Sequence, residues 1–206
     1  MSRFICQTCG VQYPDSDAPP AECPICLDER QYVGHRGQRW TTIKELAEAG
    51  HTNQIRTEEP GLNSIRTSPQ VAIGQRALLV QTPAGNVLWD CISYIDDETI
   101  AAVKELGGVQ AIAISHPHFY ASNVTWSEAF GNAPIYLHAD DRAWCMFEHE
   151  NVVHWEGDAI EPVDGVSLIH LGGHFAGAQV LHWPAGDEGR GVLLSGDTVA
   201  VVMDRR

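Results

Sequence analysis

The stretch Ala111-Ile112-Ala113-Ile114-Ser115-His116-Pro117-His118 is the most informative part of this 206-residue chain. Its first four residues predict a short buried strand, and two histidines stand directly beyond the end of that strand. In layered α/β proteins, functional side chains lie where strands run out into loops, because a loop can present polar groups that a packed sheet cannot. The single residue between the histidines turns both imidazoles toward one point in an extended loop. The stretch therefore predicts a strand that ends in a functional site.

Strand and helix patterns alternate on both sides of this stretch. Upstream, residues 77–81 and 87–90 flank Pro83-Ala84-Gly85-Asn86, which is a hairpin signal with turn residues at its centre. A helix follows, capped by Asp96 or Asp97 and ended by Gly107-Gly108. Downstream, we predict a helix over 124–130 and further strands at 135–138, 166–170, 178–183 and 192–195. This alternation places the chain in the α/β class.

Two later strand ends carry the same kind of side chain. His174 follows Gly172-Gly173 after one predicted strand, and Asp197 closes the apolar run of another. Together with His116 and His118 they could converge on a borderline metal such as zinc, and the same set suits non-haem iron. A single histidine at a strand end is usually structural, so the prediction rests on the constellation. The other seven histidines lack a partner at metal spacing and are assigned to structure: His35, His51, His138, His149, His154, His170 and His182.

Four of the six cysteines form two Cys-x-x-Cys pairs near the start of the chain, Cys6 with Cys9 and Cys23 with Cys26. Two such turns complete a tetrahedron of four soft ligands around one ion, zinc or iron. The alternative is two disulfides, which a chain without an export signal disfavours. So small a module cannot fold on apolar burial alone, so the metal would supply its stability.

The cysteine segment resembles the rubredoxin-like zinc ribbons, with Cys6-Gln7-Thr8-Cys9-Gly10, Tyr13 and Cys23-Pro24-Ile25-Cys26 carrying the resemblance. We expect this four-cysteine ribbon to occupy residues 1–34. Residues 35–69 are then expected to be a helix and a connector. The helix spans 40–50 with Thr41 or Thr42 as its cap, and the polar stretch 51–69, interrupted by Pro60-Gly61, is the connector.

From about Ala77 onward, the His-x-His pair, the later Gly-His and the later Gly-Asp resemble the metallo-β-lactamase superfamily. The resemblance implies a four-layer αββα sandwich of two packed mixed sheets with helices outside, over residues 70–206. The chain ends at Arg206, earlier than members of the family normally end. We therefore expect the domain to be incomplete at its C-terminus, as a truncated form or a fragment.

The resemblance also assigns roles, and one departure from the pattern changes them. His116, His118 and His174 would hold the first metal, and Asp197 would either complete that site or face an empty second one. In the hydrolase it would position a water or accept its proton. Asp90, which ends its strand as the first aspartate of the family does, would orient the metal-binding loop. Where the family's motif continues with an aspartate and a histidine, this chain has Tyr120 and Ala121. We therefore predict a centre with one ion. Tyr120 would either donate a hydrogen bond to developing oxyanion charge or fill the space of the lost metal.

Composition limits the partners of such a site. The formal net charge is −14 at pH 7, and 44% of the residues are hydrophobic. An acidic chain repels phosphate backbones, so we expect a small-molecule substrate and no nucleic acid. No apolar run is long enough to span a membrane, and no secretory segment is visible, so we expect a soluble, cytoplasmic protein without a membrane partner.

Three functions remain open from the sequence. The first is a hydrolase with one zinc-type ion that activates water against a small ester, thioester, lactone or phosphoester. The second is a mononuclear non-haem iron oxidoreductase that uses the ribbon for electron transfer. The third is a non-catalytic scaffold stabilised by metal, in which the ribbon recruits a partner. The substrate and the oligomeric state cannot be read from one sequence.

Overall fold

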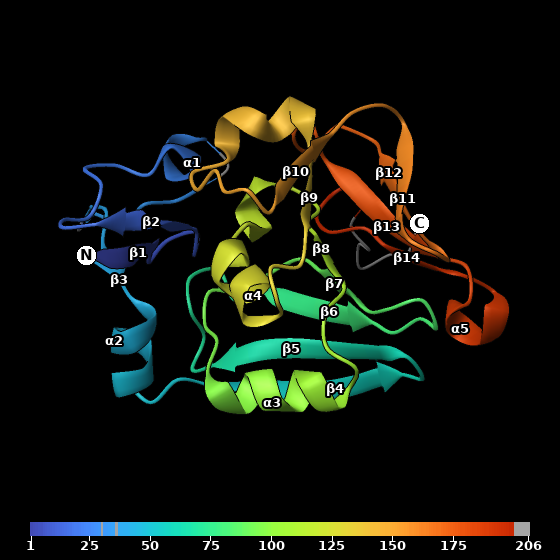
Figure 1. The fold of residues 1–206 in the computed structure, drawn as a ribbon. Coiled ribbons are helices and arrows are strands. Elements are labelled where there is room, and N and C mark those ends of the chain that lie inside the picture. Colours follow the sequence, from blue (N-terminus) through green and yellow to red (C-terminus); the bar gives the residue numbers. More distant parts are fainter. Residues whose placement is uncertain (30, 36, 200–206) are drawn as a thin grey trace, which may run out of the picture.

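The computed structural model describes residues 1–29, 31–35 and 37–199, and its strands form three sheets (Figure 1). The largest has seven strands in the order β10-β9-β8-β7-β6-β5-β4. Their bounds are β4 Thr52–Glu59, β5 Leu62–Ser68, β6 Arg76–Val80, β7 Val87–Trp89, β8 Ala111–Ala113, β9 Ile135–His138 and β10 Val152–Trp155. Strands β4 to β7 run antiparallel and β7 to β10 run parallel, so this sheet is mixed.

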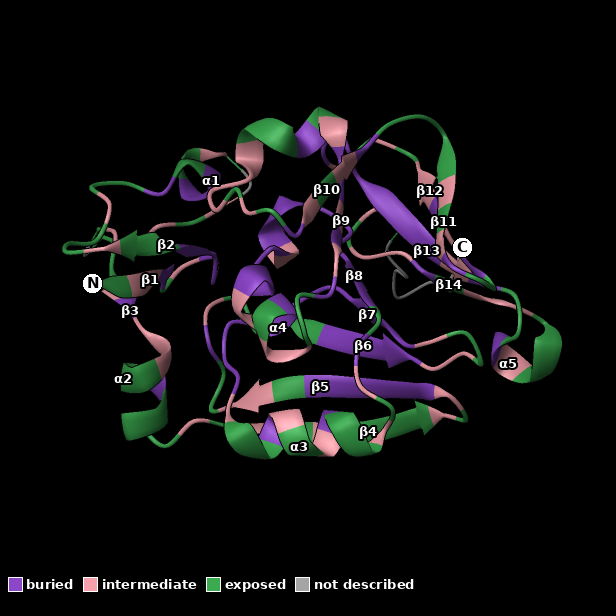
Figure 2. Ribbon diagram, in the orientation of Figure 1, coloured by how far each residue is buried: buried purple, intermediate pink, exposed green. Residues whose placement is uncertain are grey.

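The second sheet has four antiparallel strands in chain order, so only the larger of these two sheets is mixed in the described part of the chain. Its strands are β11 Ala159–Val163, β12 Val166–His170, β13 Gln179–Trp183 and β14 Val192–Leu194. One apolar cluster joins the two sheets and packs Leu78, Trp89 and Ala113 of the large sheet with Leu168 and Leu181 of the small one. Figure 2 shows this buried centre. The predicted α/β class and the packed pair of sheets are confirmed.

Helices cover the opposite face of the large sheet, where a second apolar cluster lies. Helix α3 (Asp97–Glu105) begins as predicted, because the Asp96 carboxylate accepts a hydrogen bond from the Thr99 backbone amide at 2.8 Å. Helix α4 (Asn123–Ala129) contributes to the same cluster, and the short helices η1 (Pro117–Phe119) and η2 (Ala139–Trp144) follow β8 and β9. The one-turn α5 (Gly186–Gly189) is the only α-helix after β10 among the described residues. None of the described helices has the length and apolar character needed to cross a membrane.

The prediction of a connector over 51–69 is wrong. These residues form the hairpin β4–β5, in which Ile55 pairs with Ile65 at the edge of the large sheet. The segment looked like a connector because an edge strand keeps little apolar sequence, and most of β4 is exposed or half-buried. Pro60-Gly61 is the turn of the hairpin and not an interruption in a connector.

The N-terminal module has the strands β1 (Ser2–Cys6) and β2 (Gln12–Ser16), the one-turn helix α1 (Pro24–Leu27) and the strand β3 (Trp40–Thr41). Because β3 pairs with β1, its sheet extends beyond residue 34. The helix expected over 40–50 is shorter, since α2 spans Ile43–Glu48 and Thr42 caps it by accepting a hydrogen bond from the Glu45 backbone amide. The final seven residues of the expected 70–206 domain lie outside the described residues.

Candidate metal centre

The loops after three strands bring the predicted histidines and aspartate together. His116 and His118 lie in the loop after β8, His174 follows β12, and Asp197 follows β14. One ligand atom of each lies within 4.8 Å of the others. The ring centroids of His116 and His174 are 4.6 Å apart, and His116 Nε2 lies 3.5 Å from Asp197 Oδ2. Three imidazoles and a carboxylate at this spacing form a donor set that suits a divalent transition metal.

The protonation states of these groups fit a metal ligand. Burial, together with the charges of His116 and His174, lowers the pKa of His118 to about 4, so its imidazole is neutral at pH 7. The close contact with the His116 ring lowers the pKa of Asp197, which keeps that carboxylate ionised. The buried Nε2 atom of His118 has no hydrogen-bond partner among the described residues, and His116 Nε2 faces the Asp197 carboxylate at 3.5 Å. Since a buried nitrogen without a partner is costly, a bound ion is the partner that these donors fit.

A chain of hydrogen bonds behind the site orients His116. Asp90 Oδ1 accepts hydrogen bonds from the backbone amide of Ser115 at 2.8 Å and from its hydroxyl at 2.7 Å. Ser115 Oγ lies 2.9 Å from His116 Nδ1. Because the hydroxyl proton points to Asp90, the same oxygen accepts the Nδ1 proton of His116 and leaves the Nε2 lone pair toward the ligand cluster. These contacts fit the orienting role that the resemblance implies for Asp90, and that role stays a prediction.

Asp90 is buried in a strained backbone conformation, with φ at 60°. Burial raises the pKa of its carboxyl to about 6, although the two hydrogen bonds from Ser115 act in the opposite direction. Gly196 lies against the same serine, and a Cβ at that position would collide with Ser115 Oγ. Ser115 therefore connects three strand ends. Sequence reasoning missed it, although its place directly before the His-x-His pair was the available signal.

Tyr120 lies away from the cavity that Asp197 lines. Its ring is 3% exposed within the apolar core on the helical side of the large sheet. Burial raises the pKa of its phenol well above the usual value, and the neighbouring charges that add to this shift are those of Asp141, Cys145 and Glu148. This environment favours the interpretation of Tyr120 as a packing residue. Ala121, at the other departure from the family's motif, is 2% exposed in the same core.

An open cavity of about 550 Å³ adjoins the cluster. Asp197, Phe119 and Trp89 line it, together with Arg76 at the start of β6. A cavity of this size suits a small molecule.

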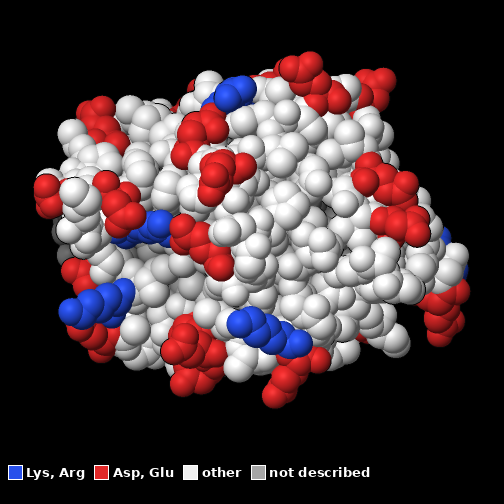
Figure 3. Space-filling view, in the orientation of Figure 1, with Lys and Arg blue, Asp and Glu red and all other residues white. Residues whose placement is uncertain are grey.

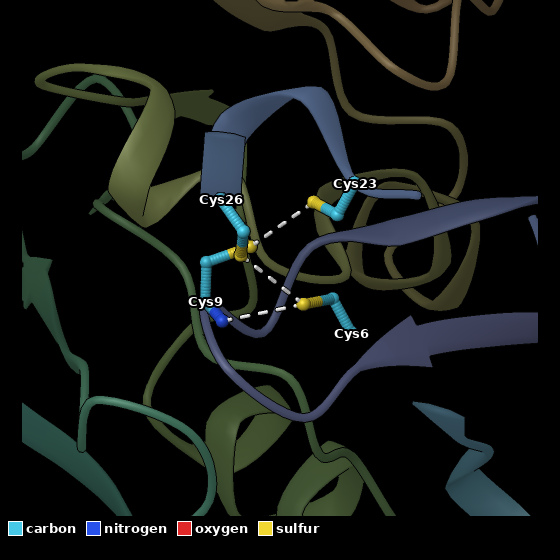
Figure 4. Close-up of side chains that lie close together, drawn as sticks. All are labelled: Cys6, Cys9, Cys23 and Cys26. Atoms are coloured by element: carbon cyan, nitrogen blue, oxygen red, sulfur yellow. Dashed lines mark hydrogen bonds between the residues drawn. The ribbon is translucent and has the colours of Figure 1, made fainter. Parts of the chain in front are cut away.

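The four predicted ribbon cysteines form the second cluster (Figure 4). All four are buried and none forms a disulfide, so the disulfide alternative is not what the structure contains. Cys6 Sγ lies 3.4 Å from Cys26 Sγ, and Cys9 Sγ lies 3.7 Å from Cys23 Sγ. The backbone amides of Thr8 and Cys9 point at Cys6 Sγ, at 3.3 and 3.4 Å. Converging sulfur atoms with amide donors around them fit a tetrahedral ion held by four thiolates.

The structure also groups histidines that sequence reasoning assigned to structure. His138 and His170 stack with ring centroids 3.7 Å apart, and Asp140 lies within 4 Å of both. His170 Nε2 donates a hydrogen bond to the Ala176 carbonyl at 2.7 Å, which braces the loop that carries His174. The prediction that these histidines lack a partner at metal spacing is wrong for His138 and His170, which group with Asp140. Three of the four ring nitrogens of the pair contact backbone groups, which agrees with a structural role.

Comparisons with known proteins identify the family of the chain and its fold. Residues 72–205 match the sequence profile of the family described as the metallo-beta-lactamase superfamily. The chain is 49% identical over 206 residues to the uncharacterized protein YmaE of Bacillus subtilis (strain 168), across all of this chain and 75% of that protein.

Among solved structures, the metallo-beta-lactamase DIM-1 is similar with a TM-score of 0.52 and 14% identity, over 64% of this chain and 65% of that chain. The metallo-beta-lactamase SMB-1, in a complex with mercaptoacetic acid, has a TM-score of 0.51 and 16% identity, over 71% of this chain and 67% of that chain. At these identities the likeness concerns the fold alone. The chain spans slightly less than two thirds of the DIM-1 chain.

Proposed function

Because the chain belongs to the metallo-beta-lactamase superfamily, we propose that it is a metal-dependent hydrolase with one zinc-type ion at His116, His118, His174 and Asp197. The proposed substrate is a small ester, thioester, lactone or phosphoester. The observation that carries the proposal is the convergence of three imidazoles and one carboxylate beside an open cavity. A second ion is not part of the proposal, because Tyr120 and Ala121 stand where its carboxylate and imidazole ligands would be needed.

When bound, a zinc-type ion would act as a Lewis acid and lower the pKa of a coordinated water from 15.7 toward about 7. The residues of the chain would hold the ion and orient the water. His116, His118 and His174 would hold the ion, and the chain from Asp90 through Ser115 keeps His116 in the tautomer that a ligand needs. The ionised Asp197 carboxylate, half-exposed at the wall of the cavity, orients a water there or accepts its proton.

The surface supports a small-molecule substrate. Acidic side chains are scattered over the face shown in Figure 3, with few basic ones between them, and the formal net charge is −14. Such a surface repels polyanions. We keep the cytoplasm as the proposed location and zinc or iron as the proposed ion of the four-cysteine module.

The test combines metal analysis with turnover. The His116→Ala and His174→Ala variants are assayed against a panel of small esters, thioesters, lactones and phosphoesters, with His182→Ala on strand β13 as the matched control. We expect each site variant to lose one metal ion per chain and its turnover, while the ion held by the cysteines stays. Unchanged turnover in both site variants, at full metal content in the control, would refute the hydrolase.

An iron oxidoreductase is the second candidate, favoured by the four converging thiolates, a donor set that also suits a one-electron iron centre. Elemental analysis after growth with zinc or iron separates the two. Zinc at the histidines supports the hydrolase, whereas iron there together with a coloured ferric centre at the four cysteines supports the oxidoreductase. If metal is found at the cysteines and not at the histidines, the non-catalytic scaffold is the function that remains.

A further inference from the structure

One side chain connects the two metal clusters. Gln75, one residue before β6, is 6% exposed. Its Nε2 amide donates one hydrogen bond to the Cys9 carbonyl at 2.5 Å and another to the His118 carbonyl at 3.0 Å. An amide group has two N–H donors, so both are used, one on each cluster. A residue of the four-cysteine module and a residue of the histidine cluster are thus held by the same nitrogen.

Further contacts join the four-cysteine module to the domain that carries the histidines. We call this contact region around Gln75 the seam. Ser93 Oγ donates a hydrogen bond to the Gly10 carbonyl at 2.9 Å, and the Gln12 backbone amide donates to the Ala121 carbonyl at 2.9 Å. Gly10 has φ of 83°, and a Cβ there would lie 2.5 Å from Ser93 Oγ and 3.0 Å from Gln75 Nε2, so this approach requires glycine. The seam is therefore built from buried side-chain donors and backbone groups at close range.

The cysteines also share the apolar core of the catalytic domain. All four belong to the same buried cluster as Ile92, Ala121 and Val124. An independent module on a flexible linker would keep a core of its own. Here, the Cys9 turn and the loop that begins at His116 are connected through buried contacts, so a change in the structure of one affects the other.

From this seam we propose that the four-cysteine module is a structural part of the histidine site, with Gln75 as the positioning residue between them. A metal ion at the cysteines fixes the turn at Cys9, the bridging amide of Gln75 fixes the His118 carbonyl, and His118 is thereby held in place to bind its own ion. Occupancy of the four-cysteine site then raises the metal affinity of the histidine site, and the coupling is reciprocal. This inference rests on the proposed function for the identity of the second ion.

A double-mutant cycle on the full chain tests the bridge. The variants are Cys9→Ser, Gln75→Met, which keeps the length of the side chain without its donors, and the two combined. The control is Gln70→Met in the same segment, because Gln70 is exposed and its amide donates to the Ala72 carbonyl, away from both clusters. The readout is the dissociation constant of zinc at the histidine site, measured by competition with a chromogenic chelator. The ion at that site is identified as the one that a His174→Ala variant loses.

We expect Cys9→Ser and Gln75→Met each to weaken zinc binding at the histidines by about tenfold, the lower end of what loss of an outer-shell partner costs. The combined variant should lose no more than either single one, because both changes break the same connection. Gln70→Met should bind as the unmodified chain does. Independent effects that multiply, or an unchanged affinity in Gln75→Met, would overturn the proposal.

Amide hydrogen exchange in the loop gives a readout that does not depend on hydrolysis. The amides of Phe119 and Tyr120 bond to the carbonyls of His116 and Pro117 at 3.0 and 3.2 Å. We expect their exchange to become faster in both Cys9→Ser and Gln75→Met, and to be unchanged in Gln70→Met. Unchanged exchange in both variants would refute the coupling even if the protein is a hydrolase. Faster exchange in a protein without any turnover would uphold the coupling and count against the proposed function.

Discussion

Replacing Ser115 by alanine should weaken metal binding at the histidines without unfolding the protein. The hydroxyl of Ser115 is fully buried and takes part in two contacts, with Asp90 Oδ1 at 2.7 Å and His116 Nδ1 at 2.9 Å. The variant keeps the backbone bond from residue 115 to Asp90. It leaves His116 Nδ1 without the group that selects its tautomer.

The magnitude follows from these contacts. Loss of an outer-shell partner lowers metal affinity by about 10 to 100-fold, or roughly 1.4 to 2.7 kcal/mol. A buried polar group without its partner costs about 1 to 3 kcal/mol, which agrees with that range. We therefore expect the zinc dissociation constant of Ser115→Ala to rise by about 10 to 100-fold.

The matched control is Ser122→Ala. Ser122 is as buried as Ser115, and its hydroxyl donates one hydrogen bond to the Ser93 carbonyl at 2.8 Å, without a contact to a ligand. Chelator competition measures zinc affinity, and thermal unfolding measures stability in the same samples. Both variants should lose a similar amount of stability, about 1 kcal/mol, but only Ser115→Ala should lose affinity. Wild-type affinity in Ser115→Ala, or an equal loss in both variants, would refute the orienting role.

Three other predictions follow from the same contacts. Gly196→Ala should lower zinc affinity in the same assay, because the added Cβ displaces the Ser115 hydroxyl; wild-type affinity would contradict this. Tyr120→Phe should leave kcat and metal content unchanged, since the ring is a core residue, and a fall in kcat at full metal content would restore its catalytic role. Glu128→Gln should lower the melting temperature at pH 7, because Glu128 accepts a bidentate bond from Arg3 that lowers the pKa of its carboxyl. That contribution, about 1 kcal/mol or less, is present above the unfolded pKa and is lost as pH falls through the folded pKa, so melting curves of the two proteins should converge in acid.

Several parts of the fold were predictable because their signals are local. The cap at Asp96, the hairpin of β6 and β7 and the strand β8 before His116 depend on residues a few positions apart, and the structure has each of them. The hairpin β4–β5 was missed for the opposite reason. An edge strand keeps few apolar residues, and only its pairing across the sheet distinguishes it from a loop.

The sequence by itself determined which donors this protein offers and how they are spaced. The ligands of both metal clusters are indicated by two Cys-x-x-Cys turns, one His-x-His pair and two later strand ends. A short turn fixes where neighbouring ligands point, so these motifs are readable from the sequence. The tertiary structure decided which groups support those donors. The contact from Gln75 to Cys9 spans 66 residues, and those from Gln75 to His118 and from Ser115 to Asp90 span 43 and 25. Hydrogen bonds at such separations exist only once the sheets have packed, and no local pattern in the chain encodes them.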